Sequence, residues 1–91
     1  MKLLPEHVLG ARGILRMSQA ELAELATVSD RTIQNFEAGR MHVKDDTLLR
    51  LQMALEHCGI EFFNTGKPGV RYHPEHDRRR LARTEPDRPV G

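Results

Sequence analysis

A short stretch of the chain carries five polar side chains of the kinds that hydrogen-bond to the edges of DNA bases. They are Asp30, Arg31, Thr32, Gln34 and Asn35. An arginine can donate two parallel hydrogen bonds to guanine, an asparagine or glutamine can pair with adenine, an aspartate can accept from cytosine, and a threonine can touch a thymine methyl group. On the exposed face of one helix, such residues would form a probe for the major groove.

Each of these side chains also has a simpler explanation. Arg31 can hold a backbone phosphate rather than a base. Thr32, Gln34 and Asn35 can complete a solvated helix face. Asp30 in a first helical turn interacts favourably with the helix dipole, and it can also orient a neighbour such as Arg31 or Gln34. The sequence alone leaves these alternatives open.

A second set of residues lies on either side of this stretch and suits contacts with DNA phosphates. A glutamine at the amino end of a helix lies beside free N–H groups, which attract anions. A serine that caps a helix can offer its hydroxyl as well. Basic side chains in the following loop can attract phosphate, with plain surface charge as the alternative. The members of this set are Gln19, Ser29, Arg40, His42 and Lys44.

Two helices that begin at serines must position these residues. Ser18 and Glu21 have the spacing of a capping box, which predicts a helix at 19–26. Ser29 is a second N-cap and predicts a helix at 30–38. The segment between them is too short for a loop but long enough for a tight turn between crossed helices. This is the helix-turn-helix plan.

The spacing of apolar residues predicts the orientation of the second helix and the position of two more. Ile33 and Phe36 lie three residues apart and face inward together, which leaves the polar side chains outward. Further helices are predicted at 5–16 and at about 46–58.

Beyond residue 59 the pattern changes to one that predicts a β-hairpin. Strand-forming residues occur at 60–63 and 70–72, and turn-forming residues occur between them. Within the first predicted helix, Gly10 and Gly13 weaken the helical signal. Their small size predicts that another helix approaches closely there.

Length and composition limit the class of protein. The 91 residues, 38% of them hydrophobic, suffice for one small domain. No apolar run is long enough to span a membrane, and the first residues lack a secretory signal. One cysteine excludes an internal disulfide and favours a reducing cytoplasm. The net charge is only +1, so binding to nucleic acid would depend on basic residues that cluster on one face.

Residues 12–59 resemble the phage-repressor/Cro-like family of helix-turn-helix DNA-binding transcriptional regulators, called the XRE family. The resemblance is carried by these residues: Arg12, Met17 to Ala23 (MSQAELA), Val28-Ser29, Thr32-Ile33, Phe36-Glu37 and Gly39-Arg40. It implies a dimer that reads a two-fold symmetric operator. It also implies that Gln19 holds a phosphate, that the second helix of the motif reads bases, and that Arg12 and Glu37 form a structural pair between the first and third helices.

The expected fold is mainly α, with a four-helix Cro/repressor-like helix-turn-helix domain and a short C-terminal β-hairpin. Residues 1–59 are expected to form the DNA-binding domain, 60–72 the hairpin and dimerisation element, and 73–91 a flexible charged tail, weakly helical around 75–83. The arginines at 78–80 and 83 are either a phosphate-binding arm or part of a solvated tail. Family members commonly have a fifth helix where this chain has the hairpin pattern.

Several apolar residues are candidates for the dimer interface. Two adjacent phenylalanines on a strand face opposite sides, so one can enter the core and the other is left for a partner. Burial in the core is the alternative for Ile60 and for one of the phenylalanines. The candidates are Leu49, Met53, Ile60, Phe62, Phe63, Val70 and Tyr72.

The sequence gives no sign of a metal, a cofactor or an enzyme active site. His57 and Cys58 are adjacent, which is poor ligand spacing, and His42, His73 and His76 lack a zinc-finger pattern. The serines are explained as caps, so no nucleophile with a base is evident. We therefore expect a cytoplasmic, bacterial or phage-encoded regulator, most simply a homodimeric repressor of a palindromic operator. The alternative is an antitoxin or adaptor that mainly binds a toxin or polymerase.

Overall fold

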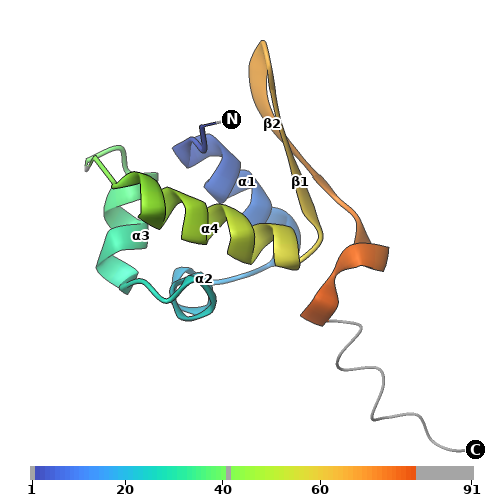
Figure 1. Cartoon of the computed structure of the whole chain (residues 1–91), viewed down its shortest axis with the longest axis horizontal. Coiled ribbons are helices and arrows are strands. Elements are labelled where there is room, and N and C mark those ends of the chain that lie inside the picture. The colour runs from blue at the N-terminus through green and yellow to red at the C-terminus, as the bar shows by residue number, and fades with distance from the viewer. Residues whose placement is uncertain (1, 41, 80–91) are drawn as a thin grey trace, which may run out of the picture.

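The computed structural model describes residues 2–40 and 42–79, which form a cluster of four helices with a hairpin along one side (Figure 1). The elements in chain order are α1 (Pro5–Leu15), α2 (Gln19–Ala26), α3 (Asp30–Glu37), α4 (Asp45–His57), β1 (Ile60–Thr65), β2 (Lys67–Tyr72) and the 3₁₀ helix η1 (Pro74–His76). The prediction of a mainly helical fold with a C-terminal hairpin is confirmed. None of the helices described has the length and apolar character needed to cross a membrane.

The four helices surround one hydrophobic core. Each contributes side chains spaced three or four residues apart, so that one face of every helix is buried. Leu22, Ile33, Leu51 and Leu55 are fully inaccessible to solvent. Burial of one such side chain contributes about 1.5–3 kcal/mol, so the core rather than helix propensity holds these short helices.

The turn between α2 and α3 forms as the two serines predict. Ser18 Oγ accepts a hydrogen bond from the Glu21 N–H (3.0 Å), and Glu21 Oε1 accepts one from the Ser18 N–H (2.8 Å). These contacts lower the pKa of Glu21. The helix ends at Thr27, whose backbone is in the left-handed region with φ 60°. Because β-branched residues disfavour that region, this turn carries local strain.

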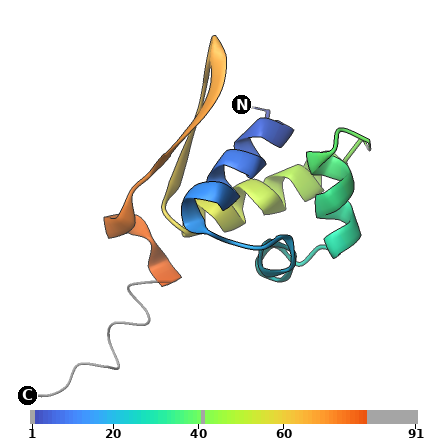
Figure 2. The same cartoon turned by 180° about the vertical axis from the view of Figure 1, so that it is seen from behind.

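The hairpin is longer than predicted, because the turn-forming segment is itself part of the strands. The register runs from Ile60 opposite Tyr72 to Thr65 opposite Lys67, and only Gly66 lies between the strands. Figure 2 shows from behind that the hairpin stands beside α1 and that its tip extends past the helices.

Contacts between α1 and the hairpin explain one glycine differently from the sequence prediction. A Cβ atom on Gly10 would lie 3.3 Å from Cγ2 of Val70, whereas one on Gly13 would meet nothing within 4 Å. Gly10 therefore admits strand β2, not another helix, and the prediction of a close helix–helix approach was wrong.

A buried histidine fixes the hairpin to the start of α1. His7 Nδ1 accepts a hydrogen bond from the Leu4 N–H (2.9 Å), so Nε2 carries the proton and donates it to the Phe63 carbonyl oxygen (2.8 Å). The ring also meets Phe62 edge-to-face at 5.5 Å. One side chain thus joins the start of α1 to strand β1.

The chain remains packed beyond residue 72, where a flexible tail was expected to begin. The His73 N–H donates to the Gly59 carbonyl oxygen (2.7 Å). Asp77 is fully buried and accepts hydrogen bonds from the Tyr72 hydroxyl (2.8 Å) and from Arg79 Nη2 (2.9 Å). Residues 73–79 are thus anchored by polar contacts that apolar periodicity does not reveal. The predicted tail from 80 to 91 lies outside the described residues.

Candidate nucleic-acid interface

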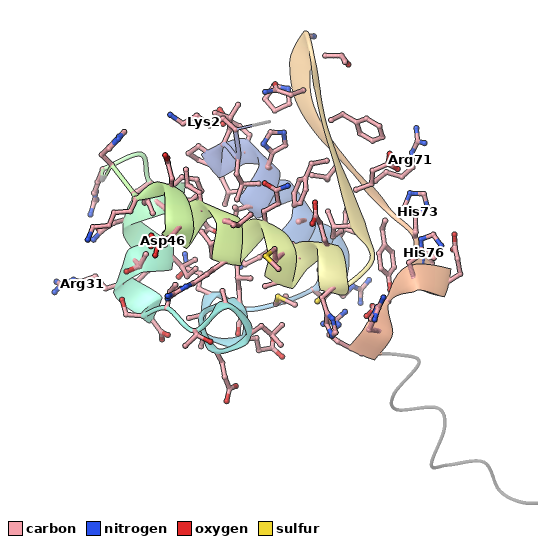
Figure 3. The ribbon with its side chains drawn as sticks, in the orientation of Figure 1. Lys2, Arg31, Asp46, Arg71, His73 and His76 are labelled. Carbon is pink, nitrogen blue, oxygen red and sulfur yellow. The ribbon has the colours of Figure 1, made fainter. Side chains whose placement is uncertain are left out.

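Helix α3 has two distinct sides. Ile33 and Phe36 enter the core, being 0% and 7% exposed. Asp30, Arg31 and Gln34 are exposed on the other side. Thr32 and Asn35, at the border, are half-buried. Figure 3 shows Arg31 pointing away from the protein at the end of the molecule that α3 forms. Because the two apolar anchors lie within one turn, the polar side is held in a fixed orientation.

The first turn of α3 is closed by its own side chains. Ser29 Oγ accepts a hydrogen bond from the Thr32 N–H (3.1 Å) and lies 2.9 Å from the Thr32 hydroxyl. Ser29 therefore serves first as the helix cap. The Thr32 hydroxyl could contact DNA only while it also bonds to Ser29. The Thr32 methyl group is not limited in this way.

A network of charged and polar groups joins α1, α2 and α3. Glu37 accepts two hydrogen bonds from the Arg12 guanidinium, each 2.7 Å long, and its side chain is only 5% exposed. Arg12 also donates to the Met17 carbonyl oxygen (2.9 Å). Hydrogen bonding to Glu37 raises the pKa of Arg12. The pair fixes the end of α3 against α1.

The same network positions Gln19, the first residue of α2. Its Nε2 donates to Glu37 Oε1 (2.8 Å). The sequence predicts only a phosphate contact for Gln19 and gives no sign of this bond, because the partners are far apart in the chain. One amide N–H is thus committed to Glu37, and the other remains for a ligand.

Basic side chains border α3 on its carboxyl-terminal side. Arg40, His42 and Lys44 are all exposed in the connection to α4. Within residues 2–40 and 42–79, no ion pair engages Arg31, Arg40 or Lys44. These cations contrast with Arg12 and Arg79, which are paired with carboxylates. An anionic ligand at this end of the molecule would therefore meet unpaired positive charge.

The arrangement of α2 and α3 matches a known family. Residues 11–63, more than half of the chain, match the family model described as helix-turn-helix. The chain belongs to the XRE-type helix-turn-helix family. That family consists of DNA-binding transcriptional regulators, so this protein is a DNA-binding regulator. No curated protein matches the chain.

The residues expected at the dimer interface of this XRE-type regulator lie in different environments. Leu49 and Met53 are 54% and 58% exposed, whereas Ile60 is only 4% exposed and lies in the core, which is the alternative that the sequence left open for it. Phe62, Val70 and Tyr72 are half-buried and pack against the core. Phe63 is half-buried as well, with the Arg71 guanidinium 4.9 Å above its ring.

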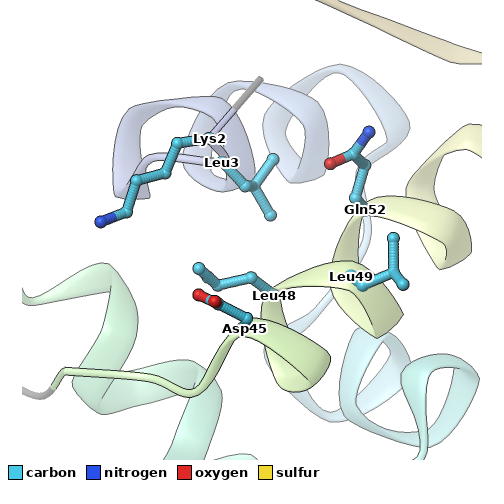
Figure 4. Close-up of a pocket in the computed structure, with 6 residues that line it drawn as sticks. All are labelled: Lys2, Leu3, Asp45, Leu48, Leu49 and Gln52. Atoms are coloured by element: carbon cyan, nitrogen blue, oxygen red, sulfur yellow. The ribbon is translucent and has the colours of Figure 1, made fainter.

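Two clefts flank the exposed residues of α4. One, of about 410 Å³, lies between the N-terminal residues and α4 (Figure 4). Its lining residues are Lys2, Leu3, Asp45, Leu48, Leu49 and Gln52. The other, of about 390 Å³, lies beside Met53 and Leu25. Each cleft has both aliphatic and polar side chains in its wall, and the aliphatic ones suit packing against apolar side chains.

Several chemically significant residues of this XRE-type regulator escape sequence reasoning. His7 and Asp77 are buried polar groups whose partners lie on other elements or outside any regular pattern. Burial also raises the pKa of the Cys58 thiol, which makes it a poor nucleophile. His73, Glu75 and His76 gather at η1. The only local signal for that cluster is their close spacing after a proline-initiated turn, which differs from a zinc-finger pattern.

Proposed function

We propose that this protein is a sequence-specific transcriptional repressor that binds a palindromic operator as a homodimer. The observation that carries the proposal is the orientation of α3. Its Ile33 and Phe36 are buried, whereas Arg31 and Gln34 are exposed and held by a helix with little freedom to rotate. A rigid polar helix face beside unpaired cations has the form needed to enter a major groove.

Within this proposal Arg31 is the principal base-reading residue. It is exposed and unpaired at the start of α3, where a recognition helix meets base edges. A bidentate contact with guanine matches its geometry. Gln34 and Asn35 extend the reading surface by one turn, with adenine as the matching base. Thr32 contributes its methyl group, and Asp30 accepts from cytosine or orients Arg31.

Phosphate contacts would fix the helix in the groove. Gln19 is held by Glu37 with one amide N–H remaining. Ser29 lies at the start of α3, and exposed basic residues follow its end. Such contacts position the protein on DNA without reading its sequence. The proposed phosphate-binding residues are Gln19, Ser29, Arg40, His42 and Lys44.

The exposed side of α4 is the proposed contact with a second copy. Leu49 and Met53 lie one helical turn apart, and each lines a cleft that is partly aliphatic. In a two-fold symmetric pair, the same side chains would enter the corresponding clefts of the other copy. The resulting half-sites would lie about one turn of DNA apart, roughly 10 base pairs.

Selection from random DNA, followed by footprinting at a stated salt concentration, tests the function. The expected result is protection of a palindrome. Arg31→Ala should weaken operator binding about 5- to 150-fold and relax the preference at one base pair of each half-site. Arg71→Ala is the matched control, because Arg71 is exposed on β2 and packs over Phe63. If no DNA sequence is enriched, the protein-binding role of an antitoxin or adaptor is favoured instead.

The dimer is tested by mass measurement at micromolar concentration. The protein should have twice the mass of one chain, and Leu49→Glu with Met53→Glu should reduce it to one. Leu9→Glu is the control, because Leu9 is 46% exposed on α1 and lines neither cleft. A monomeric mass for the unmodified protein would refute the dimer.

A further inference from the structure

Three side chains that bind metals well meet where strand β2 gives way to η1. His73, Glu75 and His76 each offer a ligand atom, and these atoms lie within 4.8 Å of one another. The rings of His73 and His76 are 5.5 Å apart and tilted by 34°. Figure 3 shows both histidines at the opposite end of the molecule from Arg31. The cluster is therefore separate from the proposed DNA-binding face.

The orientation of His73 is set by a carboxylate on the neighbouring strand. Its Nε2 lies 2.7 Å from Glu61 Oε1, and its Nδ1 lies 3.5 Å from Glu75 Oε2. When Nε2 donates its proton to Glu61, the lone pair on Nδ1 faces Glu75. Metal-binding histidines in proteins are commonly held by a carboxylate in this way, which fixes the tautomer and makes the other nitrogen a better ligand.

We propose that His73, Glu75 and His76 bind one divalent transition-metal ion, with zinc as the best match and Glu61 as the residue that orients His73. Two imidazole nitrogens and one carboxylate are a ligand set that zinc accepts, with water in the fourth position. Calcium and magnesium prefer oxygen ligands throughout. The proposal goes beyond DNA binding and does not depend on it.

The geometry can close around an ion with small side-chain movements. Ligand atoms about 2.1 Å from a tetrahedral ion lie about 3.4 Å from each other. No separation between ligand atoms therefore has to shrink by more than about 1.4 Å. The Glu75 side chain is 65% exposed and free to rotate.

Binding would tie together three parts of the fold. His73 follows β2, and its N–H donates to the carbonyl oxygen of Gly59, in the connection between α4 and β1. Glu61 belongs to β1, while Glu75 and His76 belong to η1. An ion that binds this arrangement more tightly than it binds the unfolded chain stabilises the folded state.

Titration of the untagged protein with zinc chloride, by calorimetry and by thermal unfolding, tests the site. We expect one ion per chain and a rise in Tm of at least about 5 °C when free zinc is about ten times its Kd. Magnesium chloride at the same concentration should leave Tm unchanged. An unchanged Tm with zinc, or one ion per two chains, would overturn the site.

Variants separate the ligands from their support. His76→Gln and Glu75→Gln should each abolish the zinc-dependent rise in Tm, while circular dichroism confirms that they are folded. Glu61→Gln should weaken zinc binding about 10- to 100-fold. His57→Gln is the control, because it removes an exposed histidine outside the cluster. Zinc affinity that is the same in His76→Gln, Glu75→Gln and the unmodified protein would also overturn the site.

Discussion

The two ends of this molecule use arginine in opposite ways. At the α3 end, Arg31 is exposed and no carboxylate among the described residues pairs with it. At the junction of the hairpin and η1, Arg79 closes on the buried Asp77 through three hydrogen bonds. The junction satisfies its polar groups internally and so holds the fold. At the α3 end, Arg31, Arg40 and Lys44 have no ion-pair partner among residues 2–40 and 42–79, so their charge remains for a ligand.

This comparison predicts that changes at the junction alter stability but not sequence preference. Changes in the outward side chains of α3 should alter sequence preference but not stability. Four substitutions or conditions test the comparison, and the largest expected effect comes from the junction.

Gly59→Ala should destabilise the protein by roughly 4 kcal/mol. A Cβ there would lie 2.5 Å from the His73 carbonyl oxygen, and the backbone has φ 89°. Both the collision and the left-handed backbone are costly for alanine. Gly66→Ala is the matched control, since Gly66 has the same φ but nothing within 4 Å. Urea unfolding should show a loss of only about 1 kcal/mol for the control. Equal losses in both would mean that the close approach at Gly59 is unimportant.

Glu37→Ala should cost about 3 kcal/mol, because it leaves the poorly exposed Arg12 without its partner and releases Gln19. DNA affinity should fall while the preferred operator stays the same. The double variant Arg12→Met with Glu37→Met is the control, since removal of both charges leaves neither unpaired and should restore most of the stability. An unchanged Tm for Glu37→Ala would contradict the structural role of the pair.

Acid should weaken the junction through Asp77. Burial by itself would raise the pKa of Asp77, but hydrogen bonds from Arg79 and Tyr72 outweigh it and lower the pKa from 3.8 to about 2. A lowered pKa stabilises the folded state above pH 3.8, and that contribution disappears as the pH falls towards 2. This contribution to stability is roughly 2 kcal/mol, and solvent screening at the part-exposed Arg79 makes it smaller.

The measurement is urea unfolding of the protein and of Asp77→Asn between pH 2 and pH 6. The difference in unfolding free energy should be largest near pH 6 and should shrink below pH 4. A constant difference would show that the Asp77 carboxylate charge does not support the junction.

Thr27→Gly should have the smallest effect and the opposite sign, a gain of about 0.5–1 kcal/mol. Thr27 has φ 60° at the end of α2, where glycine is unstrained. Arg16, at φ 54°, is the comparable site at the end of α1. If Thr27→Gly destabilises the protein instead, the contacts of the threonine side chain outweigh the backbone strain in the turn between α2 and α3.

Much of the fold could be predicted because its signals are local. The Ser18–Glu21 box and the Ser29 cap mark helix starts within a few residues, and Ile33 with Phe36 sets the orientation of α3. The contacts of the hairpin could not be predicted in this way. His7 and Phe63 are 56 positions apart, and nothing in the helical pattern shows that a strand, rather than a helix, would pass over Gly10.

The candidate site likewise has a part that local sequence signals predict and a part that they do not. The outward side of α3 can be predicted from the spacing of apolar residues, because it consists of the residues that are not on the buried side. The bond between Gln19 and Glu37 does not, because it depends on how α2 meets α3 in space. The η1 cluster was missed because a 3₁₀ turn brings positions 73, 75 and 76 together, whereas a search for zinc-finger spacing looks for other intervals.

The imidazole at position 7 has a consequence for relatives that share this hairpin. Asparagine could imitate its Nδ1 end and glutamine its Nε2 end, but neither reaches both Leu4 and Phe63 at once. A chain without histidine there would need two separate contacts, one to begin its first helix and another to hold its hairpin against that helix. In this chain one histidine therefore does both, and it lies apart from the residues proposed to contact DNA.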